Sequence, residues 1–180
     1  MMVEEEVPAD DEDLTPKGKC RDCPHRLDRL EHGRCKPGDT CVRAMSGRQI
    51  ELFFRENPDL ADDYRGDTFW ERRAIAARYR SQRRLLELRN DPDEVVRRVL
   101  AYRLPVEDLV NLVDDPDREV RITVADRIAP GHIERLAVDR DYLVRQYVAR
   151  RLPPGWLSRR IAFTSSNPDP GRSKRSSLSS

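Results

Sequence analysis

Apolar residues recur at a fixed interval of 24 residues along the second half of the chain. Within one copy, Val96, Leu100 and Leu104 fall at helical spacing and make one apolar face. Pro105 then ends the helix, and the about eight residues that follow leave room for only a short second helix, for which a 3-10 helix is one possible form. Matching places in successive copies carry the pairs Leu100-Ala101, Val124-Ala125 and Val148-Ala149.

Each of the three clearest copies begins with two aspartates one residue apart. In the two copies that match best, the residue between them is proline. Asp91-Pro92-Asp93 recurs as Asp115-Pro116-Asp117, and in weaker form as Asp139-Arg140-Asp141. The pattern predicts that Asp91 and Asp115 cap their helices, with the following proline as the first helical residue. Glu94, three residues after Asp91, is placed as in a capping box.

A single unit of this kind cannot bury its apolar face alone. Stacked units share a continuous core, so the sequence predicts an all-α solenoid of about four 24-residue repeats over residues 67–162, the first of them degenerate. We expect no β-sheet. Small residues at one matching place let neighbouring helices approach closely; they are Ala77, Ala101, Ala125 and Ala149.

Composition divides the remainder of the chain. Residues 1–16 hold seven Asp or Glu and are predicted to be a disordered acidic arm. Residues 17–45 form a four-cysteine module. Residues 46–66 are predicted to be a connecting helix and linker, with a break at Asn57-Pro58. Residues 163–180 contain eight Ser or Thr and are predicted to be a disordered tail.

The composition also limits the class of protein. Charged residues make up 37% of the chain, with a net charge of +1. No apolar run approaches the ~18 residues that indicate a membrane helix, and no secretory signal is recognisable, so we expect a cytoplasmic protein without a membrane partner. With three His, no phosphate-binding Gly-rich loop and no nucleophile–base pattern, we expect no enzyme activity.

All four cysteines lie within 22 residues, at Cys20, Cys23, Cys35 and Cys41. Four thiolates can complete the ligand shell of a metal ion or of a metal cluster. The first pair fits a zinc knuckle and the second does not, whereas long, uneven spacing suits a bulkier cluster. From the spacing alone, an iron–sulfur cluster and zinc therefore both stay open.

The module has further polar features. His25 and His32 could each replace a thiolate ligand, but we interpret them as polar surface residues. Between Lys17 and Arg43 there are eight Lys or Arg against four Asp or Glu, a surplus that favours thiolates and would raise the reduction potential of a bound cluster.

Two sets of arginines recur with the repeats and are candidates for binding a partner. Over residues 67–162 there are 20 Arg against 16 Asp or Glu. They could line a groove for an acidic protein or a nucleic acid backbone. Alternatively, they pair with Asp of adjacent repeats and bind nothing. The sets are Arg97, Arg121 and Arg145, and Arg103, Arg127 and Arg151.

A cysteine module followed by 24-residue copies that begin Asp-Pro-Asp-x-x-Val-Arg resembles the leucine-rich repeat variant (LRV) proteins, iron–sulfur proteins linked to nitrogen fixation in bacteria. The resemblance covers about residues 17–162. It implies a right-handed superhelix that alternates α-helix with 3-10 helix. It departs at Phe163, where a further Asp-Pro-Asp start would fall. It implies a [4Fe–4S] cluster on Cys20, Cys23, Cys35 and Cys41.

These observations lead to one expected function and two alternatives. We expect a [4Fe–4S] repeat protein that acts as a protein-interaction scaffold, that responds to redox state and that is linked to nitrogen fixation. The first alternative is a one-electron carrier to a redox enzyme. The second is a nucleic-acid-binding solenoid with a four-cysteine zinc module. We consider nucleic acid a less favoured partner than a protein.

Overall fold

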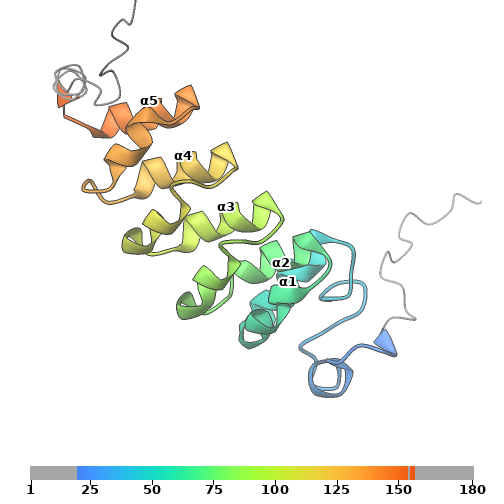
Figure 1. The fold of residues 1–180 in the computed structure, drawn as a ribbon. Coiled ribbons are helices and arrows are strands. Elements are labelled where there is room, and N and C mark those ends of the chain that lie inside the picture. The colour runs from blue at the N-terminus through green and yellow to red at the C-terminus, as the bar shows by residue number, and fades with distance from the viewer. Residues whose placement is uncertain (1–19, 154, 157–180) are drawn as a thin grey trace, which may run out of the picture.

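The computed structural model describes residues 20–153 and 155–156, so the predicted arm (1–16) and tail (163–180) lie outside the described residues. Within the described part, α-helices alternate with short 3-10 helices (Figure 1). The α-helices are α1 (Gly47–Glu56), α2 (Trp70–Ala77), α3 (Glu94–Arg103), α4 (Arg118–Arg127) and α5 (Tyr142–Arg151). The 3-10 helices are η3 (Pro58–Gly66), η4 (Gln82–Leu88), η5 (Val106–Leu112) and η6 (Ile133–Val138), and a short π-helix, η2 (Arg26–Leu30), lies in the cysteine module.

The helices stack as the repeat pattern predicts. Each α-helix from α1 to α5 contacts the next, which produces the staircase of Figure 1. The predicted all-α solenoid is confirmed, and in residues 20–153 the strand-like pairing is one isolated bridge between Lys36 and Thr40. None of the described helices is both long enough and apolar enough to span a bilayer.

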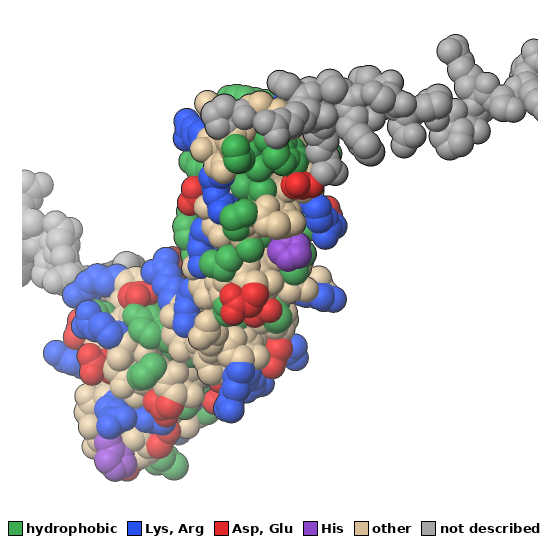
Figure 2. All heavy atoms as spheres, turned by 90° about the vertical axis from the view of Figure 1, so that its left-hand side faces the viewer, with side chains coloured by type: hydrophobic (Ala, Val, Ile, Leu, Met, Phe, Trp, Pro, Cys, Tyr) green, Lys and Arg blue, Asp and Glu red, His purple; other side chains and the backbone are tan. Residues whose placement is uncertain are grey.

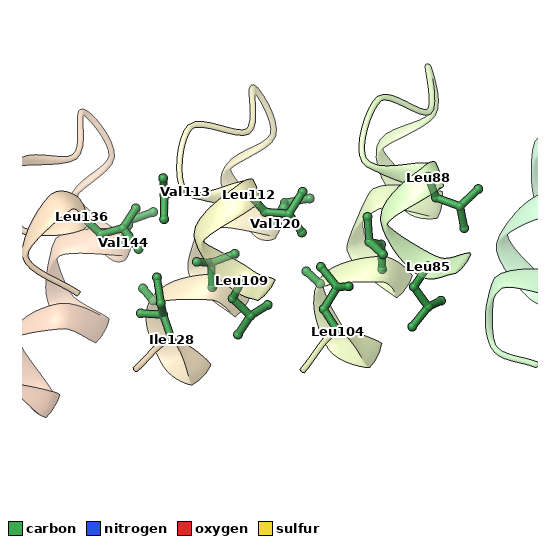
Figure 3. Close-up of a cluster of buried hydrophobic side chains, with 14 of the residues drawn as sticks. Leu85, Leu88, Leu104, Leu109, Leu112, Val113, Val120, Ile128, Leu136 and Val144 are labelled. Atoms are coloured by element: carbon green, nitrogen blue, oxygen red, sulfur yellow. The ribbon is translucent and has the colours of Figure 1, made fainter. Parts of the chain in front are cut away.

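One apolar core runs through the repeats. Leucines and valines from α3 to α5 and from the 3-10 helices η4 to η6 point into the space between layers (Figure 3). The small positions Ala77, Ala101 and Ala125 are completely buried, as their spacing predicts. Leu104 has an extended conformation because Pro105 follows it, which ends α3 and starts η5.

The predicted helix caps are wrong by two residues. Asp93, not Asp91, caps α3, and its carboxylate accepts the N–H of Val95 at 2.9 Å. The same shift occurs in α4, which Asp117 caps instead of Asp115. The reason is that Asp91 has another function: its Oδ1 accepts the N–H of Asp93 at 3.0 Å, and this turn holds the chain extended before the helix begins.

Residues 46–66 contain more structure than the predicted helix and linker. The helix α1 ends at Glu56, before Asn57, as predicted, and η3 follows directly, so the segment is built like a repeat and packs on α2. Ile50, Phe53 and Phe54 are fully buried in a second core, which includes Cys35. The cysteine module is therefore packed onto the solenoid through α1.

Candidate metal centre

The backbone of the module brings the second pair of cysteines together. Lys36 and Thr40 exchange two backbone hydrogen bonds, both 2.8 Å long, so the segment between Cys35 and Cys41 folds back on itself. Gly38 lies in this turn with φ at 83°, a conformation that glycine adopts without steric cost. Both sulfur-bearing residues are buried, with Cys35 8% and Cys41 2% exposed.

The two buried thiols form a hydrogen-bonded pair. The Cys35 thiol donates to the Cys41 sulfur, which raises the pKa of Cys35 and lowers that of Cys41 to about 6. Backbone N–H groups of Arg43 and Ala44 also donate to the Cys41 sulfur and lower its pKa further. Cys41 is thus prepared to be a thiolate, the form that binds metal.

The first pair lies nearer the surface. Cys20 and Cys23 are half-buried, joined by a turn in which the Cys23 N–H donates to the Cys20 carbonyl at 3.3 Å. The hydrogen bond to Cys41 and burial are the main causes that raise the pKa of Cys35. The charges of Cys41, Cys23 and Cys20 raise it further. Cys35 therefore lies within electrostatic range of the other three cysteines.

Four thiols are the donor set of an iron–sulfur cluster and also of a four-cysteine zinc site. Among residues 20–153, no three His, Cys, Asp or Glu side chains converge as the ligands of one ion. One tetrahedral zinc would need its sulfurs about 4 Å apart, given Zn–S bonds of about 2.3 Å. In a [4Fe–4S] cluster each thiolate binds a different iron, so the sulfurs stay further apart. The described residues supply all four thiolates that such a cluster needs, and their side chains are not gathered around one ion.

His25 is not the surface residue that the sequence suggests. Its Nε2 is hydrogen-bonded to the Tyr64 hydroxyl at 2.7 Å, and its ring centre lies 5.6 Å from that of Phe53. Burial lowers the pKa of His25 and keeps the ring neutral. His32 is exposed as expected, with Nδ1 2.7 Å from the carbonyl oxygen of Asp28.

Sequence reasoning missed the residues that attach the module to the solenoid. Asn57, fully buried, donates from Nδ2 to the Arg34 carbonyl at 2.8 Å, and Arg29 pairs with Asp59 at 2.7 Å. With the His25–Tyr64 bond, these contacts tie the module to the start of η3 and to its last turn. The available signal was the Asn-Pro break, since an asparagine at a helix end often bonds to nearby backbone.

The first arginine set is built into the repeat junctions. Arg97 donates from Nε and Nη2 to the Asp115 carboxylate, at 2.9 and 3.3 Å, and from Nη1 to the Asp91 carbonyl at 2.7 Å. Arg121 repeats this geometry with Asp139, at 2.8 and 3.1 Å. Both arginines are buried, so their geometry is that of the alternative interpretation, pairing between adjacent repeats.

The arginine–aspartate pairs that join adjacent repeats form a ladder. It begins one repeat earlier than the predicted arginine set, and within the described residues its last arginine has no carboxylate partner. Arg73, which the prediction omitted, forms a rung with Asp91 at 2.9 Å, and it lies 24 residues before Arg97. Arg145 makes the corresponding bond to the Asp139 carbonyl at 2.6 Å, but it is exposed and has no carboxylate partner within residues 20–153.

The second arginine set closes helix ends. Arg103 donates from Nη1 to the carbonyls of Ala77 and Arg80, both at 2.9 Å. These carbonyls belong to the last turn of α2 and the residues just after it, where a helix has no internal donors. The same bonds recur in the next repeats: Arg127 with Ala101 and Leu104, and Arg151 with Ala125 and Ile128. Partner binding by either set stays a prediction.

Known proteins share both parts of this architecture. Residues 17–63 match the family described as "LRV protein FeS4 cluster". A protein of Rhodobacter capsulatus, named "Uncharacterized 27.7 kDa protein in nifB 3'region", is 42% identical over 78 residues, which are 43% of this chain and 32% of that protein. A solved structure described as "a leucine-rich repeat variant with a novel repetitive protein structural motif" is 58% identical, with a TM-score of 0.75.

The match to the solved structure includes 82% of this chain and 64% of that one, so this chain spans less than two thirds of either relative. The matched family segment extends beyond the predicted module, through α1 and most of η3. This agrees with the second core, which unites Cys35 with α1. The chain belongs to the leucine-rich repeat variant family, and its N-terminal segment is the iron–sulfur segment of that family.

Proposed function

We propose that this chain binds a [4Fe–4S] cluster and presents its solenoid as a protein-binding surface, without catalysis by its side chains. The observation that carries the cluster assignment is the match of residues 17–63 to the family segment described as "LRV protein FeS4 cluster", because that segment contains all four cysteines, two of them buried and paired. Cys20, Cys23, Cys35 and Cys41 would hold the cluster, which supplies a one-electron couple when bound.

The helical face of the repeats supports a protein partner. Between α3 and α5 lies a groove of about 610 Å³, bordered by Tyr102 and Tyr147 and by charges of both signs. Tyr102 is 68% exposed. Exposed tyrosines beside balanced charges are typical of protein interfaces. A nucleic acid is less favoured, since the repeated arginines Arg97 and Arg121 are committed to carboxylates inside the fold.

A space-filling view of one face of the molecule supports the same conclusion. On the face drawn in Figure 2, Lys and Arg side chains are interspersed with Asp and Glu and with apolar side chains and form no continuous basic stripe. Nucleic acid binding depends on such a stripe. We expect the protein not to bind duplex DNA at physiological salt, and salt-sensitive binding that Arg145→Ala abolishes would favour the nucleic-acid alternative.

Electron transfer is a second candidate, favoured by the exposure of the first cysteine pair. Cys20 and Cys23 are half-buried, so a cluster bound there would lie near the surface. Exposure is one of the factors that set the reduction potential and electron exchange. A link to nitrogen fixation, suggested by the neighbourhood printed in the name of the Rhodobacter relative, belongs to the same proposal.

The test is metal analysis of the whole chain prepared without air. We expect iron and acid-labile sulfide in equal amounts, about four of each per chain, with a brown visible spectrum. Zinc alone, or colourless protein without metal, would contradict the proposal. Reversible one-electron reduction with the fold intact would favour the carrier, whereas irreversible loss of the cluster on reduction would favour the scaffold.

A further inference from the structure

Arg72 is a buried arginine of α2 that takes no part in the repeat ladder. The ladder uses its neighbour Arg73, whereas Arg72 donates from Nη1 to both carboxylate oxygens of Asp67, at 2.7 and 2.8 Å. Its guanidinium carbon lies 5.4 Å from the centre of the Phe69 ring. Only 7% of Arg72 is exposed, and its buried Nε–H has no acceptor in the described part of the chain.

Arg72 lies on the side of α2 that packs against the cysteine module. Ile75 and Ala76, three and four residues later, belong to the same core as Cys35 and Val42. Residues at these spacings share one face of a helix. The Phe69 ring, over which the guanidinium of Arg72 lies, packs against this same core.

We propose that Arg72 is a positioning residue for the iron–sulfur site, with its fixed positive charge beside the ligands and its Nε–H available to a sulfur. This inference rests on the cluster proposed above. A nearby cation stabilises the reduced, more negative state and raises the reduction potential. Asp67 opposes this effect, because its carboxylate partly cancels the charge of Arg72.

Two variants should shift the potential in opposite directions. Arg72→Gln removes the cation and should lower the midpoint potential of the bound cluster. Asp67→Asn removes the opposing charge but keeps an oxygen for the N–H of Phe69, a bond of 2.8 Å, so it should raise the midpoint. We expect each shift to be a several-fold change in the oxidised-to-reduced ratio, on a scale where tenfold is 59 mV for one electron.

The measurement is anaerobic spectroelectrochemistry of the full chain, with resonance Raman of the oxidised protein as a second readout. Loss of an N–H donor to sulfur in Arg72→Gln should shift the iron–sulfur stretching bands. The matched control is Arg121→Gln in α4, which should lower thermal stability and leave both spectra and midpoint unchanged. If Arg72→Gln retains no cluster, Asp67→Asn carries the midpoint comparison, and Arg72→Lys, which keeps the charge but lacks the Nε–H, carries the Raman comparison.

The outcomes separate this inference from the proposed function. Absence of iron from the unmodified chain overturns both. A loaded cluster whose midpoint and Raman bands do not change in Arg72→Gln and Asp67→Asn overturns the assignment of Arg72 alone. Shifts of the same sign in the two variants also overturn it, since they indicate a general loosening of α2. Opposite shifts with an unchanged Arg121→Gln control support it.

Discussion

The repeats that begin at Asp91, Asp115 and Asp139 each start with two aspartates that differ in function. Asp91 is buried, accepts a bidentate pair of hydrogen bonds from Arg73 and so joins two repeats. Asp93 caps α3 through the Val95 N–H. The first aspartate acts between helices and the second within one, although sequence alone suggests the same capping function for the first.

The two aspartates should therefore differ in their contribution to stability. Asp91→Ala leaves the buried Arg73 charge without its carboxylate, a type of change that costs about 3–5 kcal/mol. Asp93→Ala removes one cap, which costs about 1 kcal/mol. Denaturant unfolding of the two variants checks this, each being the matched control of the other. Equal losses would show that the Arg73–Asp91 pair contributes no more than a cap.

At the scale of the element, an α-helix with its 3-10 helix obtains the hydrogen bonds at its ends from the neighbouring repeats. The last carbonyls of α3 accept hydrogen bonds from Arg127 of α4, and the cap of α4 lies beside Asp115, the partner of Arg97. Apolar packing alone would leave these helix ends unsatisfied. The ladder therefore sets both the spacing and the register of adjacent repeats.

Acid should weaken the junction between α4 and α5. Burial opposes ionisation of Asp139, but the hydrogen bonds from Arg121 and the Asp141 N–H outweigh it and hold the pKa below its usual 3.8. The unfolded chain then binds the proton more readily, so this stabilisation is complete above pH 3.8 and is lost as the pH falls through the lower folded value.

We expect Asp139→Asn to be less stable than the unmodified chain at neutral pH and to lose less stability on acidification. Thermal unfolding between neutral pH and about pH 3 measures both slopes. The matched control is Asp114→Asn, because Asp114 is 83% exposed in its pair with Arg135 and should change little. If Asp139→Asn lost stability on acidification as steeply as the control does, the role given to the Arg121–Asp139 pair would be contradicted.

At the scale of the molecule, the protein has two apolar cores, and we expect loss of the metal to affect them differently. One core contains Cys35, α1 and part of α2, and the other runs through α3 to α5. In a solenoid each layer depends mainly on its neighbours. Damage at the module should therefore weaken α1 before it reaches the distal repeats.

Cys41→Ser tests this division. We expect it to lower the iron content strongly and to increase hydrogen exchange of residues 20–45 and of α1, while circular dichroism retains most of the helicity. Exchange of α4 is the internal control, since its core does not include the module. Loss of nearly all helicity would show that the repeats cannot fold without the module.

The repeat length, the helix with its short partner, the apolar positions and the clustered cysteines could be predicted from the sequence, because these features depend on local spacing. The shifted cap could not, since Asp91 and Asp93 both suit a cap and only the distant Arg73 decides between them. Nor could the aromatic packing of His25, because its partner Tyr64 lies 39 residues away.

The sequence by itself therefore determined the repeating α/3-10 unit and the presence of a four-thiol site. Tertiary structure alone decided how those parts are used: which arginines join repeats, which close helix ends, and which, like Arg72, do neither. The physical reason is that burial and charge pairing depend on neighbours in space, and identical arginines in a sequence acquire different partners only when the layers stack.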